Sequence, residues 1–220
     1  MAKGILFDID GTLLDSNTLH AQAWSDAFKE FGKNISREEV FPQIGKGGDQ
    51  LIPVFLTKGE IEKFGKQLEK RRGEIFKEQY LHQAKPFPHV RELFQLLLKE
   101  KKQIGLATSS KDEEVEQFKK ILNIEDLIQA QTTKDDAAHS KPEPDIFKAA
   151  LKKLKGISNH DIVVVGDTPY DVVAAKKIGL KVIAVLCGGF EEELLRREGA
   201  DQVYRDPTDL MNHFQESILC

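Results

Sequence analysis

One stretch decides the fold, Ile5-Leu6-Phe7-Asp8-Ile9-Asp10-Gly11-Thr12-Leu13-Leu14-Asp15. Its three leading apolar residues do not alternate with polar ones, which favours a strand buried on both faces of a parallel sheet. Gly11 then breaks the strand. Because ligands bind outside the carboxyl ends of the strands in α/β sheets, we expect Asp8 and Asp10 to enter a crevice there.

The two aspartates are expected to lie on one side of this strand, because residues i and i+2 of a strand point the same way. Two like charges so close together are unfavourable unless a cation lies between them. Mg2+ is the hard cation that a few carboxylates and a substrate phosphate hold together. Asp8 and Asp10 alone leave a second interpretation open, an acidic turn after an edge strand.

Three further short motifs follow along the chain. Thr108-Ser109 comes after the predicted strand Gln103–Ala107, Lys141-Pro142 precedes a predicted helix, and Gly166-Asp167-Thr168-Pro169-Tyr170-Asp171 follows an apolar strand. Together with Asp8-x-Asp10-Gly11-Thr12-Leu13, they resemble the four ordered motifs of the haloacid dehalogenase-like superfamily of phosphatases and phosphomutases. Each motif is weak alone, but four in order support a resemblance over essentially the whole chain.

Composition limits the class of protein. The chain has 220 residues, 40% hydrophobic and 31% charged, which suits a globular protein with one large core or a core and a smaller domain. A net charge of -4 gives no sign of nucleic-acid or anionic-membrane binding. Cys187 and Cys220 are interpreted as reduced thiols. With no predicted signal peptide or membrane span, we expect a cytoplasmic monomer without nucleic-acid or membrane partners.

The hydrophobic pattern divides the chain. Asp15-Ser16-Asn17 is interpreted as a turn and helix cap, and only helices are predicted from there to Lys85. Strands and helices alternate from Pro86 onward. The predicted fold is therefore α/β, a doubly wound parallel Rossmann-like sheet formed by residues 1–15 and 86–220, with a helical cap domain inserted as residues 16–85. The predicted segments after the cap are Val90–Lys99, Gln103–Ala107, Asp112–Leu122, Leu127–Gln131, Pro144–Leu154, Ile162–Val165, Tyr170–Ile178, Lys181–Leu186, Glu191–Glu198, Gln202–Tyr204 and the closing segment Leu210–Ile218.

The resemblance implies a magnesium-dependent phosphatase that acts on a small phosphorylated metabolite through an aspartyl phosphate. Asp8 would be the nucleophile, and Asp10 would be the general acid and then the general base. Mg2+ would be held by Asp8, the main-chain carbonyl of Asp10, and Asp167.

The resemblance also implies roles for the remaining motif residues. Thr108 and Ser109 would bind the phosphoryl group with backbone N–H groups of their loop. Lys141 would pair with the phosphoryl group and with Asp8, and Asp171 would orient Lys141 or metal-bound water. Each has a plainer alternative, since such residues also serve as helix caps or solvated loop residues.

The predicted cap supplies candidates for substrate recognition. Lys46, in the glycine-rich loop Gly45–Asp49, would contact an anion or a hydroxyl, or the loop is only an interhelical turn. The stretch His20-Ala21-Gln22-Ala23-Trp24 resembles the phosphoglycolate phosphatase and β-phosphoglucomutase branch, in which such a histidine helps to position the acid–base aspartate. A packed or exposed helix histidine is the alternative.

Three more polar residues have open roles. Arg71 and Arg72 either reach the leaving group or are solvated on a charged helix. His139 is interpreted as a loop histidine, because Asp10 already fills the role of base.

Two other functions stay open. A sugar phosphomutase must bind a second phosphate group, and Lys46 is the only cationic residue in the predicted cap loop that could bind it. A receiver-like signalling domain also forms an aspartyl phosphate, but the helical insertion and the early position of Asp8 count against it. The substrate is left open among phosphoglycolate, a hexose phosphate and a nucleoside monophosphate.

Overall fold

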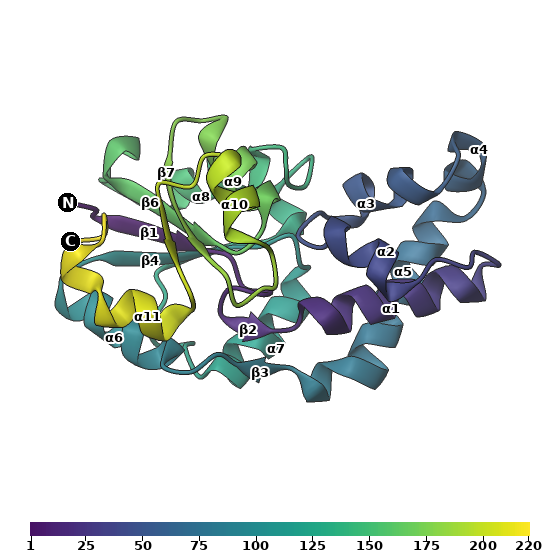
Figure 1. The fold of residues 1–220 in the computed structure, drawn as a ribbon, viewed down its shortest axis with the longest axis horizontal. Coiled ribbons are helices and arrows are strands. Elements are labelled where there is room, and N and C mark those ends of the chain that lie inside the picture. Colours follow the sequence, from purple (N-terminus) through teal and green to yellow (C-terminus); the bar gives the residue numbers. More distant parts are fainter.

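The computed structural model describes residues 1–220, and a six-stranded parallel sheet forms its centre (Figure 1). The strand order is β5-β4-β1-β6-β7-β8, so the chain builds outward from β1 on both sides, as in doubly wound folds. The predicted α/β fold is confirmed. The strands are β1 (Gly4–Phe7), β4 (Gln103–Ala107), β5 (Ala130–Thr132), β6 (Ile162–Gly166), β7 (Lys181–Val185) and β8 (Gln202–Tyr204).

Helices cover both faces of the sheet, and each face has its own apolar core. Ile5 and Phe7 point into one core and Leu6 points into the other, as the alternation of a strand requires. The first core is packed by α6 (Val90–Lys99), α7 (Asp112–Leu122) and α11 (Pro207–Asn212), and the second by α8 (Asp145–Lys153), α9 (Pro169–Lys176) and α10 (Glu192–Arg197). Three short 3-10 turns complete this part: η5 (Lys134–Asp136), η6 (Asn159–Asp161) and η7 (Phe214–Glu216).

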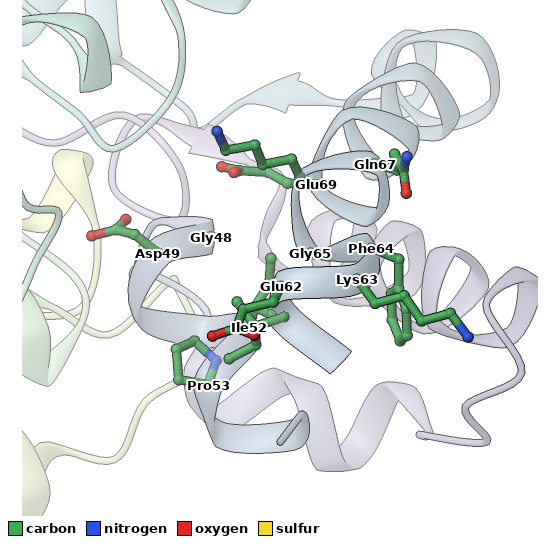
Figure 2. Close-up of a pocket in the computed structure, with 12 residues that line it drawn as sticks. Gly48, Asp49, Ile52, Pro53, Glu62, Lys63, Phe64, Gly65, Gln67 and Glu69 are labelled. Carbon is green, nitrogen blue, oxygen red and sulfur yellow. The ribbon is translucent and has the colours of Figure 1, made fainter. Parts of the chain in front are cut away.

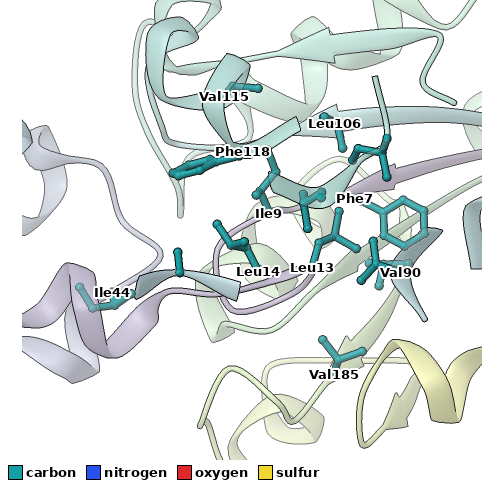
Figure 3. Close-up of a cluster of buried hydrophobic side chains, with 14 of the residues drawn as sticks. Phe7, Ile9, Leu13, Leu14, Ile44, Val90, Leu106, Val115, Phe118 and Val185 are labelled. Atoms are coloured by element: carbon teal, nitrogen blue, oxygen red, sulfur yellow. The ribbon is translucent and has the colours of Figure 1, made fainter. Parts of the chain in front are cut away.

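The first core reaches from the sheet into the segment that follows it. Figure 3 shows Phe7 beside Val90 and Leu106, while Leu13, Leu14 and Ile44 extend the cluster away from the sheet. Leu13 and Leu14 are fully buried. The turn after β1 is therefore fixed by apolar packing as well as by hydrogen bonds.

A two-stranded antiparallel ribbon, absent from the sequence prediction, joins the sheet to the helical segment (Figure 1). Its strands are β2 (Leu14–Asp15) and β3 (Lys85–Pro86). They are too short to show a hydrophobic period, which explains the omission.

All elements between these two strands are helical, as the sequence predicted. We call residues 16–85 the cap segment; its boundaries as a domain stay a prediction. It contains α1 (Asn17–Glu30), α2 (Arg37–Val40), η1 (Phe41–Gln43), α3 (Gly48–Phe55), α4 (Lys58–Glu60), η2 (Ile61–Gly65), α5 (Lys66–Ile75), η3 (Phe76–Tyr80) and η4 (Leu81–Gln83), where η2 and η3 are π-helical.

Two predicted elements were misplaced. The strand predicted over Leu127–Gln131 begins only at Ala130, because Leu127 closes a turn by donating its N–H to the Ile124 carbonyl at 3.0 Å. The last helix starts at Pro207, before the predicted segment, because Asp206 caps it by accepting the N–H of Asp209. None of the helices has the length and hydrophobicity that a membrane crossing requires.

Candidate active site

The site forms at the carboxyl ends of β1, β4 and β6, where the strand order reverses. Asp8 follows β1, Thr108 follows β4 and Asp167 follows β6, and all three side chains are buried. The turn after β1 depends on Gly11, which has a φ of +75°; a Cβ there would lie 2.2 Å from Asp167 Oδ2. Parallel strands thus bring distant parts of the chain to one edge.

Three buried carboxylates and one lysine form the floor of the site. Ligating oxygens of Asp8, Asp167 and Asp171 lie within 4.8 Å of one another. Lys141 Nζ lies 2.5 Å from Asp8 Oδ1 and 2.6 Å from Asp171 Oδ1, and it donates to the Ala107 carbonyl at 3.1 Å. The sequence prediction that Lys141 would pair with Asp8 agrees with this geometry.

The cluster contains more carboxylates than cationic groups, and this affects the pKa values of its members. Burial raises the pKa of Asp8 to about 7, although Lys141 opposes the change. Burial, together with the charges of Asp171 and Asp8, also raises the pKa of Asp167. Burial alone would lower the pKa of Lys141, but Asp171 and Asp8 raise it, so the lysine stays charged.

One lysine cannot neutralise three carboxylates, so the cluster can accept further positive charge. Its oxygens are the hard ligands that Mg2+ prefers. The side chains present therefore fit the cation that was predicted. Asp171 adds a carboxylate to Asp8 and Asp167, whereas the Asp10 carboxylate has other partners.

The Asp10 carboxylate is held by three side chains. Its Oδ1 accepts from Ser16 Oγ at 2.6 Å and lies 2.9 Å from His20 Nε2, and its Oδ2 accepts from Ser110 Oγ at 2.9 Å. Burial would raise the pKa of Asp10, but His20 and the two hydroxyls lower it to about 2. His20 in turn stacks on Phe76, with 3.9 Å between ring centroids and 11° between planes.

Ser16 and Asn17, interpreted from sequence as a helix cap, instead hold the acidic residues. Ser16 precedes α1 but makes no side-chain capping bond. Asn17 Nδ2 donates to Asp167 Oδ2 at 2.7 Å and to the Gly188 carbonyl at 2.9 Å. Thr12 Oγ1 donates to Asp167 Oδ1 at 3.0 Å. In the sequence, Thr12 belongs to the first motif, and Ser16 and Asn17 lie six and seven residues after Asp10; no other signal indicates these roles.

The loop after β4 contributes three consecutive hydroxyl residues. Thr108 Oγ1 accepts the N–H of Ser110 at 3.1 Å. Ser109 Oγ donates to the Gly45 carbonyl of the cap segment at 3.3 Å. Ser110, which the sequence analysis did not select, bonds Asp10. The loop therefore contacts both the acid–base candidate and the cap segment.

A small cavity of about 40 Å³ opens above Asp8. Side chains of the cap segment supply part of its lining, and these include His20, Lys46 and Arg72. Thr108 and Ser109 complete the predicted residues that line it. A cavity needs at least roughly 10–15 Å³ of such volume to hold one water, so this one admits only a group of a few atoms, such as a phosphoryl group.

The two neighbouring arginines of the cap segment have different surroundings. Arg72 lines the cavity with a side chain only 13% exposed, 5.1 Å from the Trp24 ring centroid and 3.5 Å from Glu114 Oε1. Arg71 pairs with Glu30 at 2.7 Å and lies outside the cavity lining. Successive helix residues point about 100° apart, so only one of them faces the site. His139, as predicted, is an exposed loop residue, paired with Asp145.

The two largest of the described pockets hold none of the predicted catalytic residues. A cleft of about 490 Å³ lies within the cap segment, between α3 and the η2–α5 helix (Figure 2). Asp49, Glu62 and Glu69 contribute acidic side chains to it. A groove of about 570 Å³ lies between η1 and helices α9 and α10. Size alone therefore does not mark the active site; the clustered acids and lysine do.

Comparisons with known proteins find phosphatases of similar sequence and a hydrolase of similar fold. Pyrophosphatase PpaX of Oceanobacillus iheyensis is 26% identical, over 98% of this chain and 98% of its own. A phosphorylated carbohydrates phosphatase of Thermotoga maritima is 24% identical, over 98% of this chain and all of its own. The crystal structure of a hydrolase from Pseudomonas syringae superposes with a TM-score of 0.85 and 30% identity, over 97% of this chain and 98% of that one.

A family model described as haloacid dehalogenase-like hydrolase matches residues 5–185. The matched range contains all four motifs and the whole cap segment. Membership in a family of hydrolases makes this chain an enzyme, which removes the receiver-like alternative. The chain belongs to the haloacid dehalogenase-like hydrolases.

Proposed function

We propose that this enzyme is a Mg2+-dependent phosphatase that hydrolyses a small phosphorylated metabolite through an aspartyl phosphate on Asp8. The observation that carries the proposal is the buried Asp8 carboxylate, 2.5 Å from Lys141 Nζ at the end of β1 and under a phosphoryl-sized cavity. Relatives named as a pyrophosphatase and a carbohydrate phosphatase support it. Release of inorganic phosphate from a panel of phosphorylated metabolites, scored by kcat/KM, is the direct test.

In the first step, an oxygen of Asp8 attacks phosphorus and the bond to the leaving oxygen breaks. Lys141 and the hydroxyl of Thr108 bind the phosphoryl oxygens and stabilise their charge. Asp10 gives a proton to the leaving oxygen. The low pKa of Asp10 describes the enzyme without substrate, and a dianionic phosphate beside it would favour the protonated form, because like charges repel.

In the second step, Asp10, now an anion, accepts a proton from water while that water attacks phosphorus. The bond between phosphorus and the Asp8 oxygen breaks, and inorganic phosphate leaves. Ser16, Ser110 and His20 keep the Asp10 carboxylate fixed during both steps. Asp8 and Asp167, with the main-chain carbonyl of Asp10, would hold Mg2+, which supplies positive charge for the phosphoryl oxygens.

Chelation of divalent cations should abolish turnover, and added Mg2+ should restore it. Mg2+ at saturation should also raise the Tm by several degrees, because a ligand present at about 100 times its Kd stabilises by about 2.7 kcal/mol. The rise should be lost in Asp167→Asn and kept in Asp201→Asn, whose carboxylate pairs with Lys176 far from the acid cluster. Full turnover in excess chelator would contradict the prediction.

We further propose that residues 16–85 form a cap domain over a core of residues 1–15 and 86–220, and that the cap selects the substrate. Two cationic side chains, Lys46 and the Arg72 that pairs with Glu114, line a cavity of only about 40 Å³. These features favour a small phosphate ester whose leaving group also carries negative charge. A phosphate ester of a bulky neutral sugar fits less well. Among the open candidates, 2-phosphoglycolate fits best.

Lys46→Ala should mainly raise KM and should leave kcat nearly unchanged. A contact made equally to the bound substrate and the transition state affects binding and not the chemical step. The rise in KM should be larger for 2-phosphoglycolate than for p-nitrophenyl phosphate. Lys63→Ala is the matched control, since Lys63 lies in the cap segment but outside the cavity lining. A uniform loss of kcat with unchanged KM would place Lys46 in the chemistry.

A sugar phosphomutase is the second candidate function. Arg72 favours it, because it gives the cavity a second cation that could grip a second phosphate. A structure titled as a putative β-phosphoglucomutase from Bacteroides vulgatus has 26% identity and a TM-score of 0.84. A requirement for a sugar bisphosphate activator would support this function, and steady phosphate release without one would support the phosphatase.

A further inference from the structure

Tyr170 connects the core to the cap loop that carries Lys46. It lies in the first turn of α9, between the metal-site candidates Asp167 and Asp171. Its hydroxyl donates to the Pro42 carbonyl at 2.6 Å, and its ring centroid lies 4.7 Å from Lys46 Nζ. Both partners belong to the cap segment, so the two contacts exist only while this loop rests on the core.

The Lys46 ammonium is held from two sides. Its Nζ donates to Gln43 Oε1 at 2.6 Å, and the face of the Tyr170 ring attracts its charge. An ammonium has three N–H donors; with one on Gln43 and one side against the Tyr170 ring, a donor stays available to an anion in the cavity that Lys46 lines. A lysine stem without such partners is flexible and turns readily to water.

The other side of Tyr170 faces open space. Its ring lines the groove of about 570 Å³, together with Phe41, Pro142 and Phe190. The groove gives the ring room on the side away from Lys46. The hydrogen bond to Pro42 therefore fixes the ring, and the ring fixes the ammonium.

We propose that Tyr170 is a positioning residue that holds Lys46 at the cavity and so sets the affinity for substrates with an anionic leaving group. This inference rests on the proposed phosphatase function. It gives the tyrosine of the motif Gly-Asp-Thr-Pro-Tyr-Asp a task separate from that of its acidic neighbours. Substrate affinity then depends on a core residue that touches no substrate.

A double-mutant cycle tests the proposal. The probe is the Ki of 2-phosphoglycolate as a competitor of p-nitrophenyl phosphate hydrolysis, which is measurable whether or not the competitor is turned over. Lys46→Met and Tyr170→Leu should each raise this Ki about three- to tenfold, the range expected for a partly desolvated cation contact. The Ki of the double variant should be no higher than the higher of the two single-variant Ki values. Tyr170→Phe, which keeps the ring but loses the bond to Pro42, should fall between wild type and Tyr170→Leu.

The possible results distinguish a failure of the Tyr170–Lys46 coupling from a failure of the proposed phosphatase function. If the two single effects multiply in the double variant, Tyr170 acts independently of Lys46 and the inference is wrong. If the wild type releases no phosphate from p-nitrophenyl phosphate, the proposed function itself fails. Tyr80→Leu is the matched control, because Tyr80 bonds Asp26 inside the cap segment and does not line the cavity; its Ki should equal that of wild type.

Discussion

Asp8→Asn is expected to abolish turnover, with a loss on the order of 10⁴-fold or more, because no other group can form the covalent intermediate. The amide matches the carboxylate in shape, so the fold should persist. Acid quenching during turnover, followed by peptide mass spectrometry, should find a phosphorylated aspartate at position 8 in the wild type and none in the variant. Asp15→Asn is the control, since Asp15 is exposed in β2 and should leave both readouts unchanged.

Asp10→Asn should separate the two steps. General acid–base catalysis typically raises the rate by about 10²–10⁴-fold, so the variant should keep a low but measurable activity. Its kcat/KM should fall more for alkyl phosphates than for p-nitrophenyl phosphate, whose leaving group needs no proton. A phosphoenzyme trapped on Asp10, or equal losses for both classes of substrate, would overturn the assigned roles.

The fold could be predicted from sequence because the central strands carry a strong signal. β1, β4 and β6 are largely apolar runs that are followed at once by Asp8, Thr108 and Asp167, so the sequence indicates both their burial and their carboxyl ends. The ribbon formed by Leu14–Asp15 and Lys85–Pro86 could not be predicted. Two-residue strands have no period, and their pairing depends on where a distant part of the chain returns.

The candidate site was only partly predictable, for a related reason. The motif acids and Lys141 were found, whereas Ser110 was not selected, Asn17 was interpreted only as a helix cap, and Thr12 was placed in the first motif without a role. A serine or an asparagine in a turn has many uses. Arg71 and Arg72 differ only in direction around one helix. Which of them faces the cavity depends on how the cap segment rests on the core, and the local sequence does not contain that information.

Lys141→Met should remove activity on every substrate and also weaken the fold. Lys141 is 1% exposed and contacts two carboxylates, and the loss of one partner from a buried ion pair costs about 3–5 kcal/mol. Its charge also serves the phosphoryl group, so kcat should fall about 10²–10³-fold or more. Urea unfolding without metal, together with steady-state kinetics, measures both effects.

The loss of stability in Lys141→Met should become smaller as the pH falls. This pH dependence distinguishes the loss of a compensating charge from the loss of side-chain packing. Without Lys141, Asp8 loses the charge that opposes the effect of burial, so its pKa lies further above the unfolded value of 3.8 and the folded state binds more protons than the unfolded state. Stability then rises as the pH falls through this raised pKa toward 3.8. Lys102→Met is the matched control, since Lys102 is also buried but bonds only the Ala2 carbonyl. The free energy of unfolding of Lys102→Met should fall by about 1–3 kcal/mol at all these pH values, and its activity should stay complete. An equal and pH-independent loss of stability in Lys141→Met would contradict the electrostatic account.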